Sequence, residues 1–374
     1  MSTTTSFPPL FPGMLLDAAG RYAQDHAGAA ELPGDPVREL GWTATLVPEA
    51  AGGVGGTLAD LASIVEGLAT HGLHLPVVET CAVVPLLLQA AAPETANRWL
   101  EAVAEGSAQL APLCALAATP DEIAVDATHL DIGFELSGRV QGVDASLPAT
   151  HWLVPATLDG EAAIFLVDAE RIGAPAATYR TMEGPRGADF ALDGLAVPEA
   201  ACIARGEPAR TALAAATDAA LLLTAADTVA ALAALVQQTV AHLKERRQFG
   251  VTLSTFQVLR HRTADMYVKY LGAKGLVVHC FDQQAQQAPD LRRTLRLAKV
   301  SLAETARHCA EAAIQMHGGM GVSEEVLATR LAQRLIASEF RYGDRLSHAA
   351  HLHPARAHAT PSPSVSNPRT GSAR

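Results

Sequence analysis

The hexapeptide FRYGDR at residues 340–345 gathers side chains that could take part in proton or anion chemistry. Tyr342 and Asp344 can ionise, and the arginines on either side would stabilise an anion beside them. Gly343 permits a sharp turn or the close approach of a ligand. Taken alone, the segment is more typical of a surface turn between two helices than of an active site.

Upstream, the segment ERRQFGVTLSTFQ (245–257) has the residues needed to bind an anion. A long helix is expected to stop at its paired arginines, Gly250 allows a turn, and Ser254 has the side chain of an N-cap for a second helix. A guanidinium and the free N–H groups of a helix start would then lie close together, which suits a diphosphate. A helical hairpin with solvated arginines is the alternative.

The segment QMHGGMGVSEE (315–325) adds a glycine loop between two helices. Gly318, Gly319 and Gly321 would let backbone amides approach a ligand closely, and Gln315 lies at the helical entry to the loop. A single glycine loop is a weak signal. Two such segments, in this order and on long helices, are a much stronger one.

The rest of the chain predicts the elements that hold these segments. Helices separated by turns are expected over residues 1–108, and short apolar runs around LDGE predict a β-hairpin within a middle β domain at 109–205. Alanine- and leucine-rich stretches predict a C-terminal helical bundle over 206–353. The tail 354–374 is rich in Pro, Ser and Arg, which predicts disorder.

Composition narrows the class of protein. A net charge of −11 argues against nucleic acid as the main partner and favours a small molecule or another protein. The five cysteines have no CxxC spacing, which predicts reduced thiols, no metal site and a cytoplasmic location. No signal peptide is evident, and the apolar stretch 219–236 is interrupted by Asp227, which favours a buried helix over a membrane span.

At this point the sequence resembles the acyl-CoA dehydrogenase family over nearly the whole chain. RRQFGVTLSTFQVLRHRTADM (246–266) is similar to the family's RxxFGxxxxxFQ segment, and AIQMHGGMGVSEE (313–325) to its QxxGGxG segment. ELGWTATLVPEAAGGVGG (39–56) resembles the N-terminal domain, and ALDGLAVPEA (191–200) the end of the β domain. The type, order and spacing of these motifs all match.

The resemblance implies a mainly α fold with a middle, barrel-like β domain and a C-terminal four-helix bundle. It implies FAD bound at a subunit interface, an acyl-CoA substrate, and an electron-accepting flavoprotein as a partner. By motif, the cofactor contacts from one subunit would come from Arg246, Phe249 and Gln257. Those from its neighbour would come from Gln315, Gly318 and Gly319.

The sequence departs from the family at the catalytic base, a carboxylate that takes the proton alpha to the thioester while a hydride passes to the flavin. In most members this is a glutamate twenty-seven residues after the glutamine of QxxGGxG. Counting from Gln315 reaches Tyr342, followed by Gly343 and Asp344. Tyrosine is a poor base, although the flanking arginines would lower its pKa.

A minority of members carry the glutamate on the first bundle helix, twenty-six residues before the arginine of RxxFG. Counting back from Arg246 reaches Ala220, so this position also lacks a carboxylate. Asp227 lies two helical turns further on, on nearly the same face. Asp227 and Asp344 are therefore the candidate bases. The structural alternative for Asp227 is a buried or interface polar group, and that for Asp344 is a helix cap or an ion pair with Arg341 or Arg345.

The middle domain departs from the family as well. LCALAATPDE (113–122) only approximates the family's Thr-Glu and Gly-Ser-Asp elements, with Thr119 as the nearest hydroxyl candidate. VDASLPATHW (143–152) lacks the Trp-Ile-Thr element. We therefore expect better preserved contacts to the FAD diphosphate than to the flavin ring.

The favoured hypothesis is one subunit of a heteromeric bacterial acyl-CoA dehydrogenase, in which a sister chain supplies the glutamate of a tetramer. Its substrates would be bulky or branched acyl-CoA thioesters. The alternatives are a self-sufficient homotetramer that uses Asp227 or Asp344, a non-catalytic member of the family, and a flavin-dependent oxidase or monooxygenase.

Overall fold

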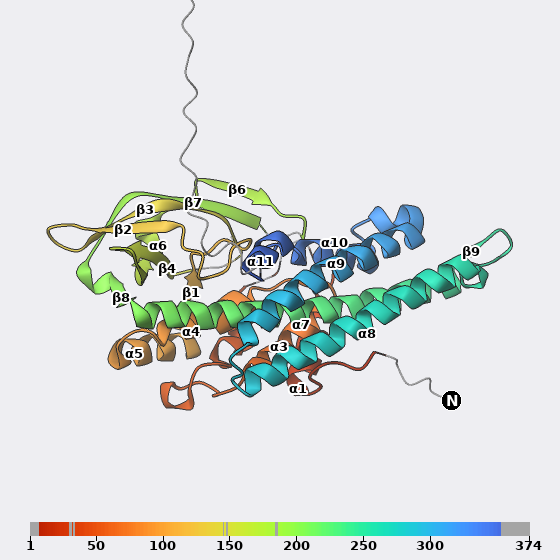
Figure 1. Cartoon of the computed structure of the whole chain (residues 1–374), viewed down its shortest axis with the longest axis horizontal. Coiled ribbons are helices and arrows are strands. Elements are labelled where there is room, and N and C mark those ends of the chain that lie inside the picture. The colour runs from red at the N-terminus through yellow and green to blue at the C-terminus, as the bar shows by residue number, and fades with distance from the viewer. Residues whose placement is uncertain are drawn as a thin grey trace, which may run out of the picture.

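The chain forms helices at both ends of its sequence and one β-sheet between them (Figure 1). The computed structural model describes residues 7–29, 32, 34–144, 146, 149–183 and 186–352. The N-terminal elements are α1 (Met14–Asp25), α2 (Pro36–Glu39), the 3-10 turns η1 (Trp42–Ala44) and η2 (Glu49–Ala51), α3 (Leu58–Ala69), the π-helical segment η3 (Val78–Val83), α4 (Val84–Leu88) and α5 (Pro93–Ala104).

Local sequence explains where α3 begins and how it is held. Thr57 and Asp60 form a reciprocal capping box, which satisfies free N–H groups at the start of the helix. Further along α3, the buried Glu66 carboxylate accepts hydrogen bonds from the backbone of Leu10 and Phe11. The segment before α1 is thereby fixed to the N-terminal helices.

The middle of the chain folds into one mixed sheet. Its elements are β1 (Leu110–Pro112), β2 (Val125–His129), β3 (Phe134–Asp144), β4 (His151–Leu158), β5 (Glu161–Asp168), β6 (Ala177–Arg180), β7 (Arg186–Val197) and β8 (Cys202–Arg205), with the short helix α6 (Ala169–Ile172) and the turn η4 (Glu199–Ala201). The strand order is β6-β7-β3-β2-β4-β5-β8, and β1 pairs in parallel with β4.

The predicted hairpin is confirmed as β4 and β5, which pair from His151 opposite Asp168 to Leu158 opposite Glu161. The two turn residues have φ values of 53° at Asp159 and 79° at Gly160. Two positive φ angles in a two-residue loop match the twist of an antiparallel pair, and Asp-Gly is a favoured sequence for them.

The C-terminal elements form a bundle of long helices. They are α7 (Glu207–Glu245), the small hairpin β9 (Arg247–Gln248) and β10 (Val251–Thr252), η5 (Leu253–Thr255), α8 (Gln257–Ala285), α9 (Leu291–His317), η6 (Gly318–Val322), α10 (Leu327–Ser338) and α11 (Arg345–Leu352). Among the described residues, only α7 is long and apolar enough to span a membrane, and 94% of its apolar window is buried within the fold. It is a core helix, as its interruption by Asp227 predicted.

The described residues form two hydrophobic cores. One joins the N-terminal helices to the C-terminal bundle through α7 and contains residues such as Leu61, Leu87 and Leu232. The other lies within the sheet around residues such as Leu136 and Phe165. The helix, sheet and helix arrangement expected for the family is therefore confirmed, and 1–108, 109–205 and 206–353 remain our proposed domain division.

The expected N-cap at Ser254 is wrong. Ser254 lies in the 3-10 turn η5, and α8 begins at Gln257 with no side-chain cap. The Ser254 hydroxyl lies 3.1 Å from the Thr252 hydroxyl, and its carbonyl accepts a hydrogen bond from the Arg260 side chain. The tail 354–374, predicted to be disordered, lies outside the described residues.

Candidate functional site

The hexapeptide 340–345 connects α10 to α11, and its central residues 341–343 are buried. The backbone is left-handed at Tyr342 (φ 54°) and Gly343 (φ 90°). The Tyr342 N–H donates to the carbonyl of Leu116 at 2.7 Å, and the Gly343 N–H donates to the carbonyl of Ala117 at 3.1 Å. The turn is therefore bonded directly to the segment that follows β1.

The Tyr342 side chain is occupied by a hydrogen bond of its own. It is 2% exposed, and its hydroxyl donates to Glu79 Oε1 at 2.5 Å. Burial first, and then the Glu79 carboxylate, raise the pKa of Tyr342 well above its ordinary value and outweigh Arg341, which lowers it. Arg341 therefore lowers this pKa as the sequence predicts, but burial and Glu79 dominate and the pKa is raised overall.

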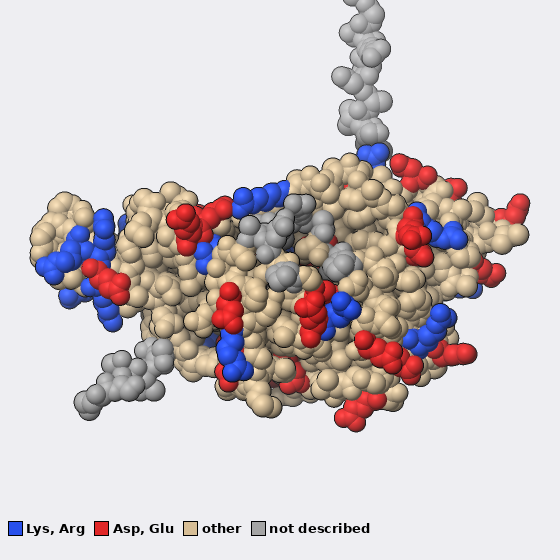
Figure 2. All heavy atoms as spheres, turned by 180° about the vertical axis from the view of Figure 1, so that it is seen from behind, with Lys and Arg blue, Asp and Glu red and all other residues tan. Residues whose placement is uncertain are grey.

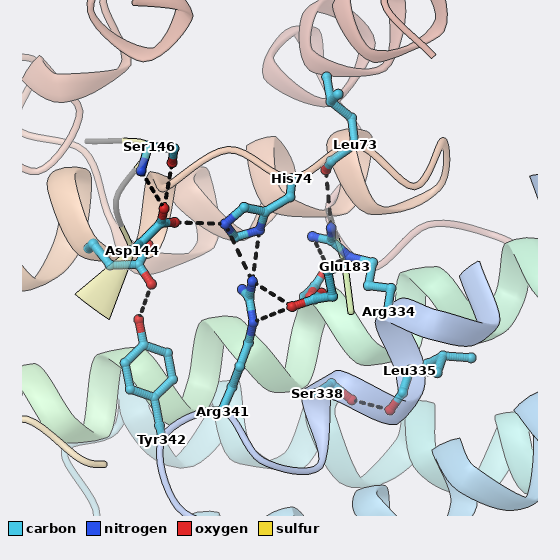
Figure 3. A network of polar contacts seen from close by, with 12 residues as sticks. Leu73, His74, Asp144, Ser146, Glu183, Arg334, Leu335, Ser338, Arg341 and Tyr342 are labelled. Atoms are coloured by element: carbon cyan, nitrogen blue, oxygen red, sulfur yellow. Dashed lines mark hydrogen bonds and ion pairs between the residues drawn. The ribbon is translucent and has the colours of Figure 1, made fainter. Parts of the chain in front are cut away.

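Arg341 is the centre of a buried ionic network that links all three parts of the chain (Figure 3). Its guanidinium lies 2.8 Å from a Glu183 oxygen and 2.9 Å from His74 Nδ1. His74 Nε2 in turn lies 3.0 Å from Asp144 Oδ2. A guanidinium only donates, so these partners assign an Nδ1 acceptor and an Nε2–H donor to His74.

The charge of Asp144 is well supported in this network. Burial raises the pKa of Asp144, but hydrogen bonds from His74 and Ser146 outweigh that effect and bring it down to about 2. Asp144 therefore ends the chain of contacts as a carboxylate. Both Arg341 and Glu183 have side chains only 9% exposed, so the network is shielded from water on several sides.

Asp227, the first candidate base, is held in a buried ion pair. Its Oδ1 lies 2.7 Å from Nη2 and 2.8 Å from Nε of Arg334, a residue of α10. The two side chains are 5% and 7% exposed, and Arg334 also donates to the carbonyl of Leu73. A carboxylate in this position is already neutralised by a guanidinium.

Asp344, the second candidate base, accepts a hydrogen bond from the Ser347 N–H at 2.7 Å at the start of α11. It is partly exposed and has the position of a helix cap. Beneath the turn, the Lys299 ammonium donates to the carbonyls of Ser338 and Arg341, each at 2.5 Å. These bonds fix the end of α10 and hence the position of Tyr342.

A cleft of about 1010 Å³ opens beside this network, between the N-terminal helices, the sheet and α10. Among its lining residues are His74, Glu183 and Arg334. Tyr342 and Asp227 are not among them. A ligand in this cleft would meet the outer side of the ionic network and not the position of the family's base.

The residues predicted to contact the FAD diphosphate lie together at the far end of the bundle, where α7 turns into α8. Arg246, Phe249 and Gln257 are all exposed there. Phe249 is 89% exposed and has a φ of 54°. Gln315, Gly318 and Gly319 are also exposed, at the end of α9.

Direct contacts bring the two motifs to the same end of the molecule. The His317 ring, just before Gly318, stacks on His242 near the end of α7 with 4.3 Å between ring centroids. The Thr263 hydroxyl near the start of α8 lies 3.9 Å from the sulfur of Met316. We call the exposed region made by residues 246–257 and 315–322 the bundle tip.

The bundle tip fits the anionic part of FAD. Figure 2 shows Lys and Arg side chains gathered at this end of the molecule. The sequence from 244 to 262 has five basic residues and one acidic residue, in a chain with a net charge of −11. A Cβ added at Gly250, Gly318 or Gly319 would meet no atom within 4 Å, so these backbones are open to a ligand. Basic side chains and accessible amides are the donors that a diphosphate requires.

The segment 113–122, which is expected near the flavin ring, is largely buried or half-buried and makes contacts within the chain, unlike the exposed bundle tip. Thr119 is buried, and its backbone N–H donates to the Glu122 carboxylate. Beyond it, the Asp121 carboxylate pairs with Arg292 of α9, which also pairs with Asp218 of α7. The segment expected near the flavin ring is thus tied to the helical bundle.

Sequence reasoning missed the residues that occupy the turn's inner side. Glu79 lies within an otherwise apolar stretch and His74 in an unremarkable loop, and neither belongs to a motif. A glutamate among buried apolar positions is itself a signal, because a buried carboxylate requires a partner. The sequence does not indicate that the partner is Tyr342, more than 260 positions away.

The arrangement of N-terminal helices, a middle sheet and a C-terminal helical bundle is that of the acyl-CoA dehydrogenase fold. Residues 16–107 match the family model described as the acyl-CoA dehydrogenase N-terminal domain, and residues 211–344 match the C-terminal domain. The chain belongs to the acyl-CoA dehydrogenase family. It is an FAD-dependent oxidoreductase that acts on acyl-CoA, and its place is in lipid metabolism.

Several relatives have been named or solved. The chain is 28% identical to the acyl-CoA dehydrogenase IpdE2 of Mycobacterium tuberculosis, over 85% of this chain and 88% of that protein. Its fold resembles that of one chain in the crystal structure of the ChsE4-ChsE5 complex from Mycobacterium tuberculosis. The TM-score is 0.78 and the sequence identity 21%, and the match covers 93% of this chain and 99% of the other chain. It resembles the steroid ACAD Tcur3481-Tcur3483 with a TM-score of 0.77 and 26% identity, over 90% and 95%.

Proposed function

We propose that this chain is one subunit of a heteromeric FAD-dependent acyl-CoA dehydrogenase in which a second, related chain supplies the carboxylate base. One observation carries the proposal. The family's glutamate position is Tyr342, whose hydroxyl donates to Glu79 and whose N–H donates to Leu116. A buried phenol that donates to a carboxylate keeps its proton, so it is unsuited to take one from a substrate.

The remaining candidate bases support the same proposal. The Asp227 carboxylate would have to leave Arg334 before it could accept a proton, and Arg334 would then be buried without its counter-ion. Asp344 would have to leave the N-terminus of α11. A self-sufficient homotetramer therefore requires one of two existing structural contacts to break.

The proposed roles of this chain concern binding and position. Arg246, Phe249 and Gln257 would hold the adenosine diphosphate part of FAD, as suits their exposed, basic setting. Gln315, Gly318 and Gly319 would hold that part of a cofactor shared with a neighbouring subunit. When bound, FAD would supply the acceptor for the hydride that leaves the beta carbon of the acyl group as the double bond between the alpha and beta carbons forms.

The partners in this proposal follow from the family and the named relatives. The substrate is an acyl-CoA thioester with a bulky acyl group, because a structural relative is named as a steroid ACAD. The complex would be a cytoplasmic tetramer with two copies of each chain. An electron-accepting flavoprotein would reoxidise it.

The test is the visible absorption spectrum of the full-length chain, purified alone and after co-expression with a related dehydrogenase chain that carries the family's glutamate. Each sample is mixed with a steroid-side-chain acyl-CoA and with a short straight-chain acyl-CoA under anaerobic conditions. We expect flavin bleaching only from the co-expressed pair. A single chain that is yellow and bleaches with substrate would overturn the proposal, and Asp227→Asn would then show whether Asp227 is the base.

A further inference from the structure

His317, the last residue of α9, is a buried histidine without a polar partner. It is 7% exposed, and neither of its ring nitrogens has a hydrogen-bond partner among the described residues. A buried polar group that makes no hydrogen bond destabilises the fold, so an apolar side chain would serve better if packing were the only role of this position. The histidine therefore calls for a second role.

The ring of His317 stacks on the ring of His242 in α7, with 4.3 Å between the centroids and 22° between the planes. Burial, and then Arg246, lower the pKa of His242 and outweigh Glu245, which raises it. Burial, and then His242, lower the pKa of His317 to about 4. Both imidazoles are thus uncharged at neutral pH. We call these two residues the histidine stack.

The histidine stack connects the two segments of the bundle tip. On one side, the His242 carbonyl accepts a hydrogen bond from the Arg246 N–H at 2.8 Å, which fixes the backbone where α7 ends. On the other side, Gly318 follows His317 directly and, with a φ of 61°, turns the chain from α9 into η6. The two segments leave different helices, so the stack helps to fix each segment against the other.

We propose that the histidine stack positions the bundle tip for the FAD diphosphate without contacting the cofactor. The inference rests on the proposed cofactor roles of Arg246, Gly318 and Gly319. Donors bind a diphosphate well only when their positions are held in advance, because a loose site must be ordered as the ligand binds. The ring nitrogens of His317 are buried, so its effect reaches the cofactor through the backbone of Gly318.

The histidine stack makes the binding of FAD sensitive to acid. A protonated ring would place a charge in a buried contact, next to a second imidazole and to Arg246, with Glu245 as the acidic group that acts on the stack. The pKa of His317 in the stacked form is below the ordinary value of 6.5, so the open form binds more protons, and falling pH between 6.5 and about 4 favours it. A direct contact with the cofactor would act in the opposite direction, because an imidazolium attracts a diphosphate.

The test is equilibrium dialysis of FAD against full-length protein, purified alone and as the co-expressed pair, at about pH 7.5 and about pH 5.5. At the higher pH, His317→Leu should weaken FAD binding about tenfold or more, whereas His317→Phe keeps an aromatic ring for the stack and should stay within about twofold of wild type. Between the two pH values, wild-type binding should weaken about fivefold or more. His242→Phe/His317→Phe should lose this pH dependence. The control His261→Phe, which replaces an exposed histidine near the start of α8, should keep it.

Three results would overturn the proposal. One is wild-type FAD binding by His317→Leu, and another is wild-type pH dependence in His242→Phe/His317→Phe, which remains a test even where His317→Leu does not fold. The third is tighter FAD binding at the lower pH, since the rings would then be direct ligands. Arg246→Ala separates this inference from the proposed function. If it leaves FAD binding unchanged, the proposed cofactor site fails, and if it weakens FAD binding while the histidine variants do not, only the histidine stack fails.

Discussion

Replacing Arg334 by methionine tests whether Asp227 is a structural ion-pair partner or a base kept for catalysis. The two side chains are 7% and 5% exposed, and the Asp227 carboxylate lies 2.7 Å from the guanidinium. Removal of one partner from a buried pair leaves the other charge without compensation and costs about 3–5 kcal/mol in the free energy of unfolding. We expect Arg334→Met to lose that amount.

The double variant Asp227→Leu/Arg334→Met should recover most of the loss, because both charges are gone and the positions are filled by apolar groups. Urea unfolding of the four proteins in the cycle gives the coupling energy, which we expect to exceed about 2 kcal/mol. Arg210→Met is the matched control. Arg210 pairs with Glu207 and both side chains are exposed, at 73% and 67%, so its loss should leave the urea midpoint nearly unchanged.

A cost for Arg334→Met no larger than that of the control would refute this account of Asp227. So would a loss of substrate-dependent bleaching when only Asp227→Asn is introduced into this chain, in a co-expressed pair that stays folded and keeps its flavin. The first result would mean that the pair does not hold α7 to α10. The second would mean that Asp227 reaches substrate.

Three further outcomes are expected. Burial, and then the Arg341 guanidinium, lower the pKa of Lys299 from 10.5 to about 7 in the folded protein. Between pH 7 and pH 10.5, Lys299 is therefore more protonated in the unfolded chain than in the folded one. The stability of the wild type relative to Lys299→Met should therefore rise with pH across that window in urea unfolding, and a constant difference would contradict this. Gly343→Ala should lower the free energy of unfolding by about 1–3 kcal/mol, because φ is 90° and the new Cβ would lie 2.6 Å from His348 Nε2. An unchanged urea midpoint would show that the turn relaxes to accept the Cβ. Arg246→Ala should change the free energy of unfolding by no more than about 0.5 kcal/mol. In equilibrium dialysis of the co-expressed pair it should weaken FAD binding about tenfold or more. Equal FAD binding would show that Arg246 is not part of the cofactor site.

The overall fold was predictable because the features that determine it are local. The long alanine- and leucine-rich stretches became α7, α8 and α9, and LDGE became the turn between β4 and β5. The helix starts were less predictable. Ser254 lies within the 3-10 turn that precedes α8 and does not cap that helix, and residue propensities alone do not distinguish these two positions.

The candidate site was only partly predictable. The exposed tip residues belong to motifs with fixed spacing, so counting along the sequence found them together. The partners of Tyr342, Arg341 and Asp227 come from other parts of the chain and follow no spacing rule. Glu79, His74 and Arg334 were therefore visible only once the fold had brought them to the turn.

The placement of α7 has a consequence for how this protein is made. The N-terminal helices, among them α3 and α4, pack on α7, and all belong to one core. During translation, the apolar faces of these early helices emerge more than a hundred residues before the helix that covers them. Until α7 has been synthesised, these apolar faces are exposed to solvent, where chaperones can bind them and where they are prone to aggregate. A fragment that ends before residue 207 would be expected to stay in that state permanently.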